Sequence, residues 1–145
     1  MGEAIELRVL DKNDCLRLLA GHVVGRVVFT EAAMPAAVPV RYILDDEEVL
    51  FHADRQLANN ARNSVVAFEV DDIDPDTHTG WNVVGIGEAY EVRNPARLAQ
   101  LTCSLPERFT DRTMHMMSIP LQVFSGQHYL TPRSRDQLCS DNTTG

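Results

Sequence analysis

Three side chains of types that bind anions lie close together in the sequence: Arg41, His52 and Arg55. Guanidinium and imidazole groups donate charge-assisted hydrogen bonds to phosphate. Arg55 also lies beside the expected start of a helix, where free backbone N–H groups favour a negative charge. The three residues therefore predict a phosphate site. The alternative is that Arg41 forms an exposed ion pair with Asp54 or a nearby glutamate, because such pairs are common and contribute little.

A β-hairpin would have to bring Arg41 and His52 together. Side chains at residues 38–44 alternate between the two faces of an expected strand. Four acidic residues follow, and residues 49–53 form the expected return strand. One register pairs only apolar residues on one face, namely Leu44 with Val49, Tyr42 with Phe51, and Val40 with Ala53. The same register places Arg41 directly opposite His52 on the other face.

A second candidate is the long strand expected over residues 81–93, which begins with the only tryptophan of the chain, Trp81. Gly85, Gly87 and Ala89 lie on the same face as Trp81. Such small residues let a backbone or a planar ring approach closely, so Trp81 would stack on a ligand or fill a dimer interface. For the glycines alone, a strongly coiled barrel strand that needs glycine for curvature is the better interpretation.

Other site chemistries find little support in the sequence. The acidic segment 72–76 has the alternation of a calcium loop, but Thr77 and Val83 occupy positions that require Gly and Glu. The five histidines lack the spacing of zinc ligands. His115 is expected to be a satisfied barrel residue, with haem ligation as the alternative. We predict no metal site, and no side chain is identified as a catalytic acid or base.

Composition limits the partners and the compartment. The chain has 145 residues and a formal net charge of −8, which disfavours binding to nucleic acid or to an anionic membrane. No segment reaches the about 20 apolar residues that span a bilayer, and the N-terminus does not resemble a signal peptide. Three separated cysteines indicate no disulfide framework. We therefore expect a cytoplasmic protein.

The order of the expected elements predicts a mainly β fold. Six or seven strands alternate with short helices over residues 11–20, 56–62 and 94–101, which indicates a β-barrel with flanking helices. No GxGxxG motif follows a strand, so a Rossmann nucleotide site is not supported. We expect one domain over residues 1–131 and a polar, disordered tail over residues 132–145.

Four segments, in the same order, resemble the pyridoxamine 5'-phosphate oxidase-like split-barrel proteins of actinobacteria. They are GHVVGRVVF at 21–29, PVRY at 39–42, VAFEVDDID at 66–74 and TGWNV at 79–83. The resemblance implies a six-stranded split β-barrel, a homodimer, and FMN or the deazaflavin F420 in a groove between the subunits. The residues that it implies at the flavin are Pro39, Val40, Arg41, Tyr42, His52, Ala53, Arg55, Gln56, Leu57 and, from the partner, Trp81.

The sequence departs from this family at the expected phosphate site. Relatives usually carry a Gly/Ser-rich turn and a lysine before the helix, where this chain has Asp54, Arg55 and Gln56. Three functions follow from these features. The first is a flavin-dependent oxidoreductase that moves a hydride to or from a small-molecule substrate. The second is a non-catalytic module that holds flavin or haem as a sensor or store, and the third is a structural dimer that has lost its cofactor site.

Overall fold

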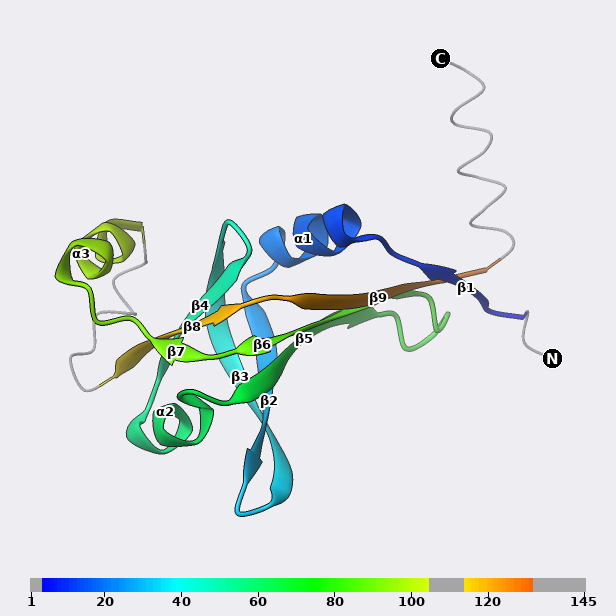
Figure 1. Cartoon of the computed structure of the whole chain (residues 1–145). Coiled ribbons are helices and arrows are strands. Elements are labelled where there is room, and N and C mark those ends of the chain that lie inside the picture. Colours follow the sequence, from blue (N-terminus) through cyan, green and yellow to red (C-terminus); the bar gives the residue numbers. More distant parts are fainter. Residues whose placement is uncertain (1–3, 105–113, 132–145) are drawn as a thin grey trace.

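The computed structural model describes residues 4–104 and 114–131. Within these residues the chain forms one curled nine-stranded sheet and three helices (Figure 1). The strands are β1 (Glu6–Val9), β2 (Val24–Glu31), β3 (Met34–Asp45), β4 (Glu48–Ala53), β5 (Val65–Ile73), β6 (Gly80–Glu88), β7 (Tyr90–Glu91), β8 (His115–Pro120) and β9 (Val123–Leu130). The helices are α1 (Lys12–Ala20), α2 (Arg55–Ala61) and α3 (Pro95–Ser104). None of these three helices is long and apolar enough to cross a membrane.

The sheet curls because its longest strand, β3, changes its partner along its length. Residues 34–41 pair with β2, whereas residues 42–45 pair with β4. The strand order is β1-β9-β6-β5-β2-β3-β4-β8-β7, with antiparallel pairs throughout. The curl brings β8 against β6 at Gly87, where a Cβ would lie 1.9 Å from the carbonyl oxygen of Pro120. Close backbone approach at a glycine therefore occurs within the chain, which confirms the curvature interpretation at this position.

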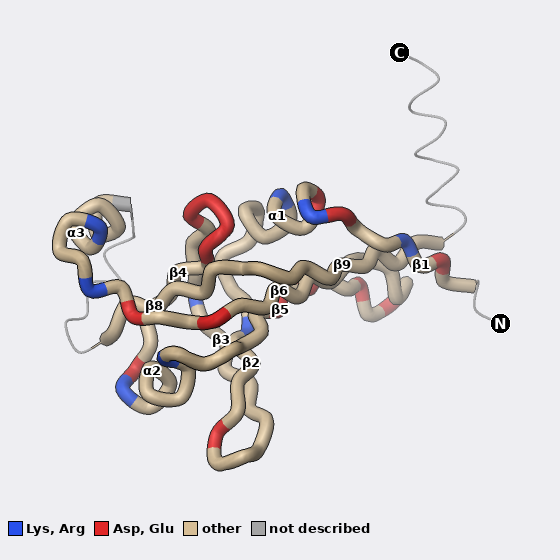
Figure 2. The backbone as a smooth tube through the Cα atoms, in the orientation of Figure 1, with Lys and Arg blue, Asp and Glu red and all other residues tan. Residues whose placement is uncertain are grey.

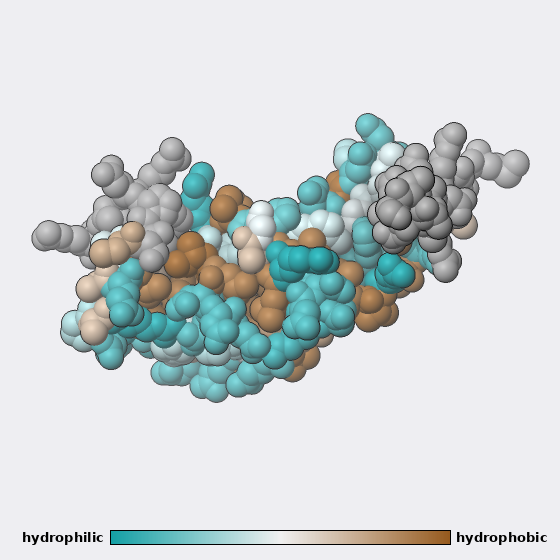
Figure 3. Space-filling view, turned by 90° about the horizontal axis from the view of Figure 1, so that it is seen from above, coloured by the Kyte–Doolittle hydropathy of each residue, from teal (hydrophilic) through white to brown (hydrophobic). Residues whose placement is uncertain are grey.

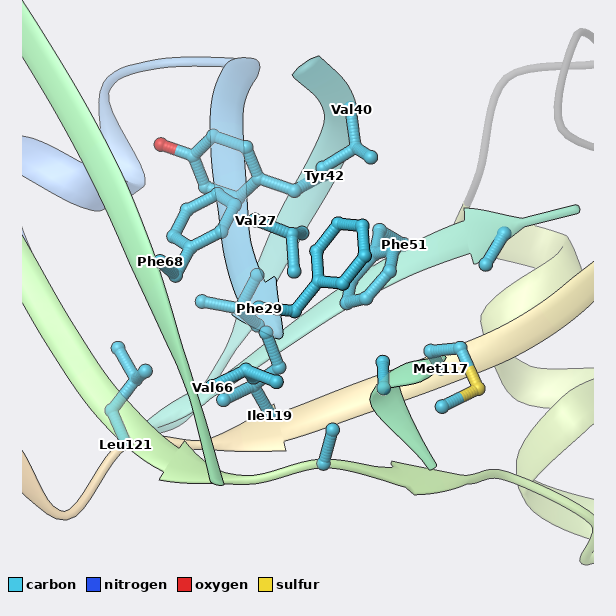
Figure 4. Packing of buried hydrophobic residues seen from close by; sticks show 14 of the residues in the cluster. Val27, Phe29, Val40, Tyr42, Phe51, Val66, Phe68, Met117, Ile119 and Leu121 are labelled. Carbon is cyan, nitrogen blue, oxygen red and sulfur yellow. The ribbon is translucent and has the colours of Figure 1, made fainter. Parts of the chain in front are cut away.

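The inner face of the curled sheet holds the main hydrophobic core (Figure 4). The rings of Tyr42 and Phe68 pack edge to face with their centroids 4.7 Å apart. Gly25 makes room for this pair, because a Cβ there would lie 2.3 Å from the Phe68 ring. Helix α1 covers the same core with the buried side chains of Cys15 and Leu19. A close-packed core of this kind fixes the strands that carry the candidate site.

A smaller cluster lies on the other face of β4 and β8, under helix α3. It contains Leu50, Val92, Leu101 and Met116. Seen from above, hydrophobic residues also reach the surface along the middle of the molecule, between hydrophilic margins (Figure 3). The turn between β3 and β4 is strongly acidic, whereas residues 32–40 of the β2–β3 hairpin carry no charge (Figure 2).

The expected fold class is confirmed, and the differences concern strand number and element ends. The sheet has nine strands in place of six, because β1 and β7 are short additions and residues 115–130 form two strands. The single strand expected over residues 81–93 is divided at Ala89. Its N–H donates to the carbonyl oxygen of Ser64 over 2.9 Å, after which the chain pairs with β8. The tail expected over residues 132–145 lies outside the described residues.

Candidate ligand-binding site

A pocket of about 320 Å³ opens between the β2–β3 hairpin and helix α2. Its lining consists of Phe29, Glu31, Val38, Pro39, Val40, His52, Asp54, Gln56, Leu57, Asn60 and Met114. We call this the β2–α2 pocket. Its volume lies at the small end of the range for ligand sites, about 300–1,000 Å³, and its mixture of apolar walls with a few polar groups is typical of them.

Two carboxylates define the electrostatics of the β2–α2 pocket. Glu31 accepts a hydrogen bond from Gln56 Nε2 over 2.8 Å, which links the hairpin to helix α2. Asp54 caps that helix by accepting from the backbone N–H of Leu57, also over 2.8 Å. The carboxylate of Asp54 thus already satisfies a free N–H at the start of the helix. The pocket lining includes no lysine or arginine, so a phosphate would lack a positive partner inside it.

The predicted hairpin register is confirmed where the ladder exists. Tyr42 pairs with Phe51, and Leu44 pairs with Val49. The ladder between β3 and β4 ends at Tyr42, and from Arg41 back to Met34 β3 pairs only with β2, on its other edge. The third expected pair, Val40 with Ala53, and the Arg41–His52 pair therefore lie beyond the ladder.

Of the three anion-binding candidates, only His52 belongs to the pocket lining. His52 lines the β2–α2 pocket and pairs across the sheet with Met116. Arg41 is exposed, opposite Val24, and Arg55 is exposed as the first residue of α2. Neither arginine is among the residues that line the pocket. A joint role of the three side chains in phosphate binding stays a prediction.

The structure gathers five of the ten predicted flavin contacts in the pocket: Pro39, Val40, His52, Gln56 and Leu57. Two others are core residues, since Ala53 is buried and the buried Tyr42 hydroxyl donates to the carbonyl oxygen of Leu19. Burial raises the pKa of Tyr42 to about 12. Trp81 lies outside the pocket lining, where its ring packs edge to face on His22 with the centroids 4.7 Å apart.

Some lining residues were not predicted from the sequence. Asn60 follows Gln56 by one helical turn, so an i, i+4 relation from a predicted contact would have found it. Glu31 and Phe29 reach the pocket through the β2–β3 pairing, which includes Phe29 with Ala36. Met114 carries no local signal, because the residues before β8 enter the pocket only through tertiary packing.

A charged cluster around Glu91 fixes the far end of helix α2. Its carboxylate accepts from Arg62 over 2.8 Å, from His115 Nδ1 over 2.7 Å and from Arg93 over 2.6 Å. Burial would raise the pKa of Glu91, but these hydrogen bonds outweigh it and lower the pKa to about 2. His115 on β8 thus has a hydrogen-bond partner within the sheet, the Glu91 carboxylate on β7, as expected for a satisfied barrel residue. The cluster ties α2 to β7 and β8 and so steadies one wall of the pocket.

Comparison with known proteins identifies the family. The family model for pyridoxamine 5'-phosphate oxidase matches residues 11–127. The chain belongs to this family. The uncharacterised protein Rv0080 of Mycobacterium tuberculosis is 41% identical over 104 residues, which cover 67% of this chain and 68% of that one.

Solved structures give the same result for the fold. A protein of unknown function from Corynebacterium diphtheriae, DIP1874, is 30% identical with a TM-score of 0.73, covering 86% of this chain and 98% of that one. A FAD-binding protein from Mycobacterium smegmatis is 24% identical with a TM-score of 0.67, covering 86% and 99%. The family and the split-barrel fold inferred from the four sequence segments are confirmed.

Proposed function

We propose that this protein binds FMN with the flavin ring at the β2–α2 pocket and uses it to oxidise or reduce a small-molecule substrate. The observation that carries the proposal is the pocket itself, which gathers five of the residues implied by the family resemblance at one place. A flavin-binding protein of the same fold, the FAD-binding protein of Mycobacterium smegmatis, supports the cofactor class.

The donor set of the pocket fits the ring of a flavin. Phe29, Val40 and Leu57 supply apolar walls, while the side-chain amides of Gln56 and Asn60 can donate to and accept from the heteroatoms of a ring. A bound flavin supplies the electron chemistry, and the protein binds and orients it. The polar residues would set the orientation of the ring, and the apolar walls would exclude water from one side of it.

The phosphate of the flavin requires positive charge that the pocket lining lacks. Glu31 and Asp54 would repel a phosphate inside the pocket, so we assign its binding to the exposed side chains of Arg41, on β3, and Arg55, the first residue of α2. The acidic lining also favours FMN over F420, whose tail of glutamates would add further negative charge.

We further propose that the working unit is a homodimer. The resemblance implies that Trp81 approaches the flavin from the second subunit, and in this chain Trp81 lies outside the lining of the pocket. A second copy would therefore supply the tryptophan that one chain does not bring to its own pocket. Two-fold association of identical chains is the commonest form of soluble oligomer.

Titration of the purified protein with FMN tests the proposal, with Arg41→Ala and Arg55→Ala as variants. Loss of one charged hydrogen bond to phosphate, worth about 1.5–3 kcal/mol, should weaken FMN binding about ten- to a hundredfold. Arg17→Ala is the matched control, because Arg17 is an exposed arginine on α1 whose ion-pair partner is Asp14. Unchanged FMN affinity in both variants would place the phosphate elsewhere.

The same titration separates the competing functions. Failure to bind FMN, FAD or F420 would contradict a flavin function and favour a structural dimer with a degenerate site. A haem absorption spectrum in the purified protein would favour a haem-binding module instead. Flavin binding without reduction of the flavin by any nicotinamide donor would favour a sensor or store.

A further inference from the structure

Glu31, at the end of β2, is a partly buried carboxylate that forms no ion pair within the described part of the chain. Its hydrogen-bond partner is the neutral side-chain amide of Gln56, and residues 32–40, which follow it, carry no charge. Four other partly buried glutamates are each paired with a lysine or an arginine, namely Glu47, Glu48, Glu69 and Glu91. Because a carboxylate is costly to remove from water without a cationic partner, the position of Glu31 at a pocket indicates a role outside folding.

The charges that line the β2–α2 pocket are not equivalent. Glu31 and Asp54 both belong to the lining, in which only His52 can become cationic. Asp54 is exposed, and its carboxylate accepts from the backbone N–H of Leu57, which offsets part of its charge. Glu31 is less exposed, and its partner is a side-chain amide. It is therefore the stronger source of negative potential in the pocket.

A flavin ring at this pocket would meet that negative potential in two charge states. The oxidised ring is neutral, whereas uptake of two electrons and one proton gives the reduced ring one negative charge. The phosphate keeps its charge in both states, so Arg41 and Arg55, to which we assign the phosphate, favour both states equally. A carboxylate beside the ring repels only the reduced state. Charge close to the ring is one of the means by which a protein tunes a flavin.

We propose that Glu31 lowers the reduction potential of the bound flavin, so that the protein works as a reductase. This inference rests on the proposed flavin function and narrows it from oxidation or reduction to reduction. Relative to a pocket without this carboxylate, reduced FMN is held less tightly and gives up its electrons more readily.

The charge of the ring also indicates the class of substrate. A nicotinamide donor supplies a hydride that makes the ring anionic beside Glu31. The substrate then takes this hydride from the ring and a proton from water, which returns the ring to its neutral state and removes the repulsion. An acceptor of a hydride and a proton is a compound with an electron-poor double bond, and it leaves as the reduced product.

Separate binding measurements with oxidised and with reduced FMN test the role of Glu31 without any substrate. Equilibrium dialysis at pH 8, where an ordinary imidazole is neutral, gives both dissociation constants, with dithionite in excess and oxygen excluded for the reduced form. In Glu31→Gln the amide oxygen can still accept from Gln56, so the variant removes the charge alone. The ratio of the reduced to the oxidised dissociation constant should fall about tenfold, which corresponds to a midpoint potential higher by about 30 mV for a two-electron couple.

Matched variants separate this charge from others. Glu31→Asp keeps a carboxylate and should have a ratio close to that of the parent. Asp54→Asn, in which the amide also caps a helix, should lower the ratio by less than Glu31→Gln. Glu88→Gln removes an equal charge from the exposed end of β6, outside the pocket lining, and should leave the ratio unchanged. Arg55→Ala should weaken the binding of both forms by the same factor.

The outcomes distinguish the two proposals. Thermal unfolding should show that the variants stay folded. If the parent and Glu31→Gln both bind FMN with the same ratio, the role of Glu31 is wrong and the flavin function stands. A ratio that changes in Arg55→Ala and not in Glu31→Gln would place the ring at the arginines and would also overturn the inference. Failure of the parent to bind FMN in either state would contradict the proposed flavin function, and this inference with it.

Discussion

Glu91 and Glu69 lie on the same sheet, and the carboxylate of each accepts a hydrogen bond from an arginine. Their pKa values nevertheless move in opposite directions. Glu91 receives hydrogen bonds from Arg62, His115 and Arg93, and its pKa is lowered to about 2. Burial raises the pKa of Glu69 to about 7, although the carboxylate shares Arg26 with Asp71. The side chains are buried to a similar extent, 13% exposed for Glu91 and 21% for Glu69.

The difference between the two glutamates follows from the number of cationic donors for each carboxylate. Three donors from different segments serve one carboxylate at Glu91, which makes that cluster a tertiary link between α2, β7 and β8. One arginine serves two carboxylates at Glu69, so that face keeps uncompensated charge when both are ionised. The Glu91 cluster therefore stabilises the fold, whereas the negative charge around Glu69 is compensated only in part.

The largest expected effect is the loss of stability in Glu91→Gln. Removal of the charge leaves Arg62 and His115 without their anionic acceptor and should lower the free energy of unfolding by about 1–3 kcal/mol. Because the folded pKa lies below the ordinary 4.5, this contribution is present above pH 4.5 and is lost as the pH falls towards 2. Urea unfolding as a function of pH checks this. Glu88→Gln on the exposed end of β6 is the control and should change stability by less than about 0.5 kcal/mol.

A smaller effect of opposite sign is expected for Glu69→Gln. The folded pKa of Glu69 is raised, so its stabilising contribution is present below pH 4.5 and is lost as the pH rises through about 7. The amide mimics the neutral carboxyl and should make the variant more stable than the parent above pH 7, with little difference near pH 4.5. Equal stability of the two proteins over this whole range would show that Glu69 titrates normally in the folded state.

The smallest effect is expected for Arg26→Gln. The hydrogen bond and charge of Arg26 oppose the rise in the pKa of Glu69, so their removal should raise that pKa further. Stability should change by less than about 1 kcal/mol, because the Arg26 side chain is 54% exposed. Carboxyl-detected NMR titration follows Glu69 itself. A shift of its pKa towards the ordinary value would contradict this account of the outer face.

The sequence predicted the elements of the fold better than their ends. The alternation of apolar residues and the pairing of Tyr42 with Phe51 were read correctly, because a one-residue slip would turn every apolar side chain outward. The sequence does not predict the start of β3 at Met34, since Pro35 is unfavourable in most strands. This half of β3 pairs only with β2, so its other edge has no ladder and tolerates proline.

The candidate site was predicted less completely, because pockets form from tertiary contacts. Pro39, Val40, His52, Gln56 and Leu57 were found through the family resemblance. The acidic character of the lining was only partly foreseen: Asp54 was recognised as a departure, but Glu31 enters through the packing of the hairpin on α2.

The central claim is that two copies of the chain form the species that holds the flavin. Sedimentation velocity of the parent mixed with FMN, detected at the visible absorption of the flavin, tests both parts at once. Bound flavin should sediment at the mass of a dimer. Flavin that sediments only as the free molecule would contradict the flavin function, and flavin that sediments with a monomer of the parent would contradict the proposed assembly.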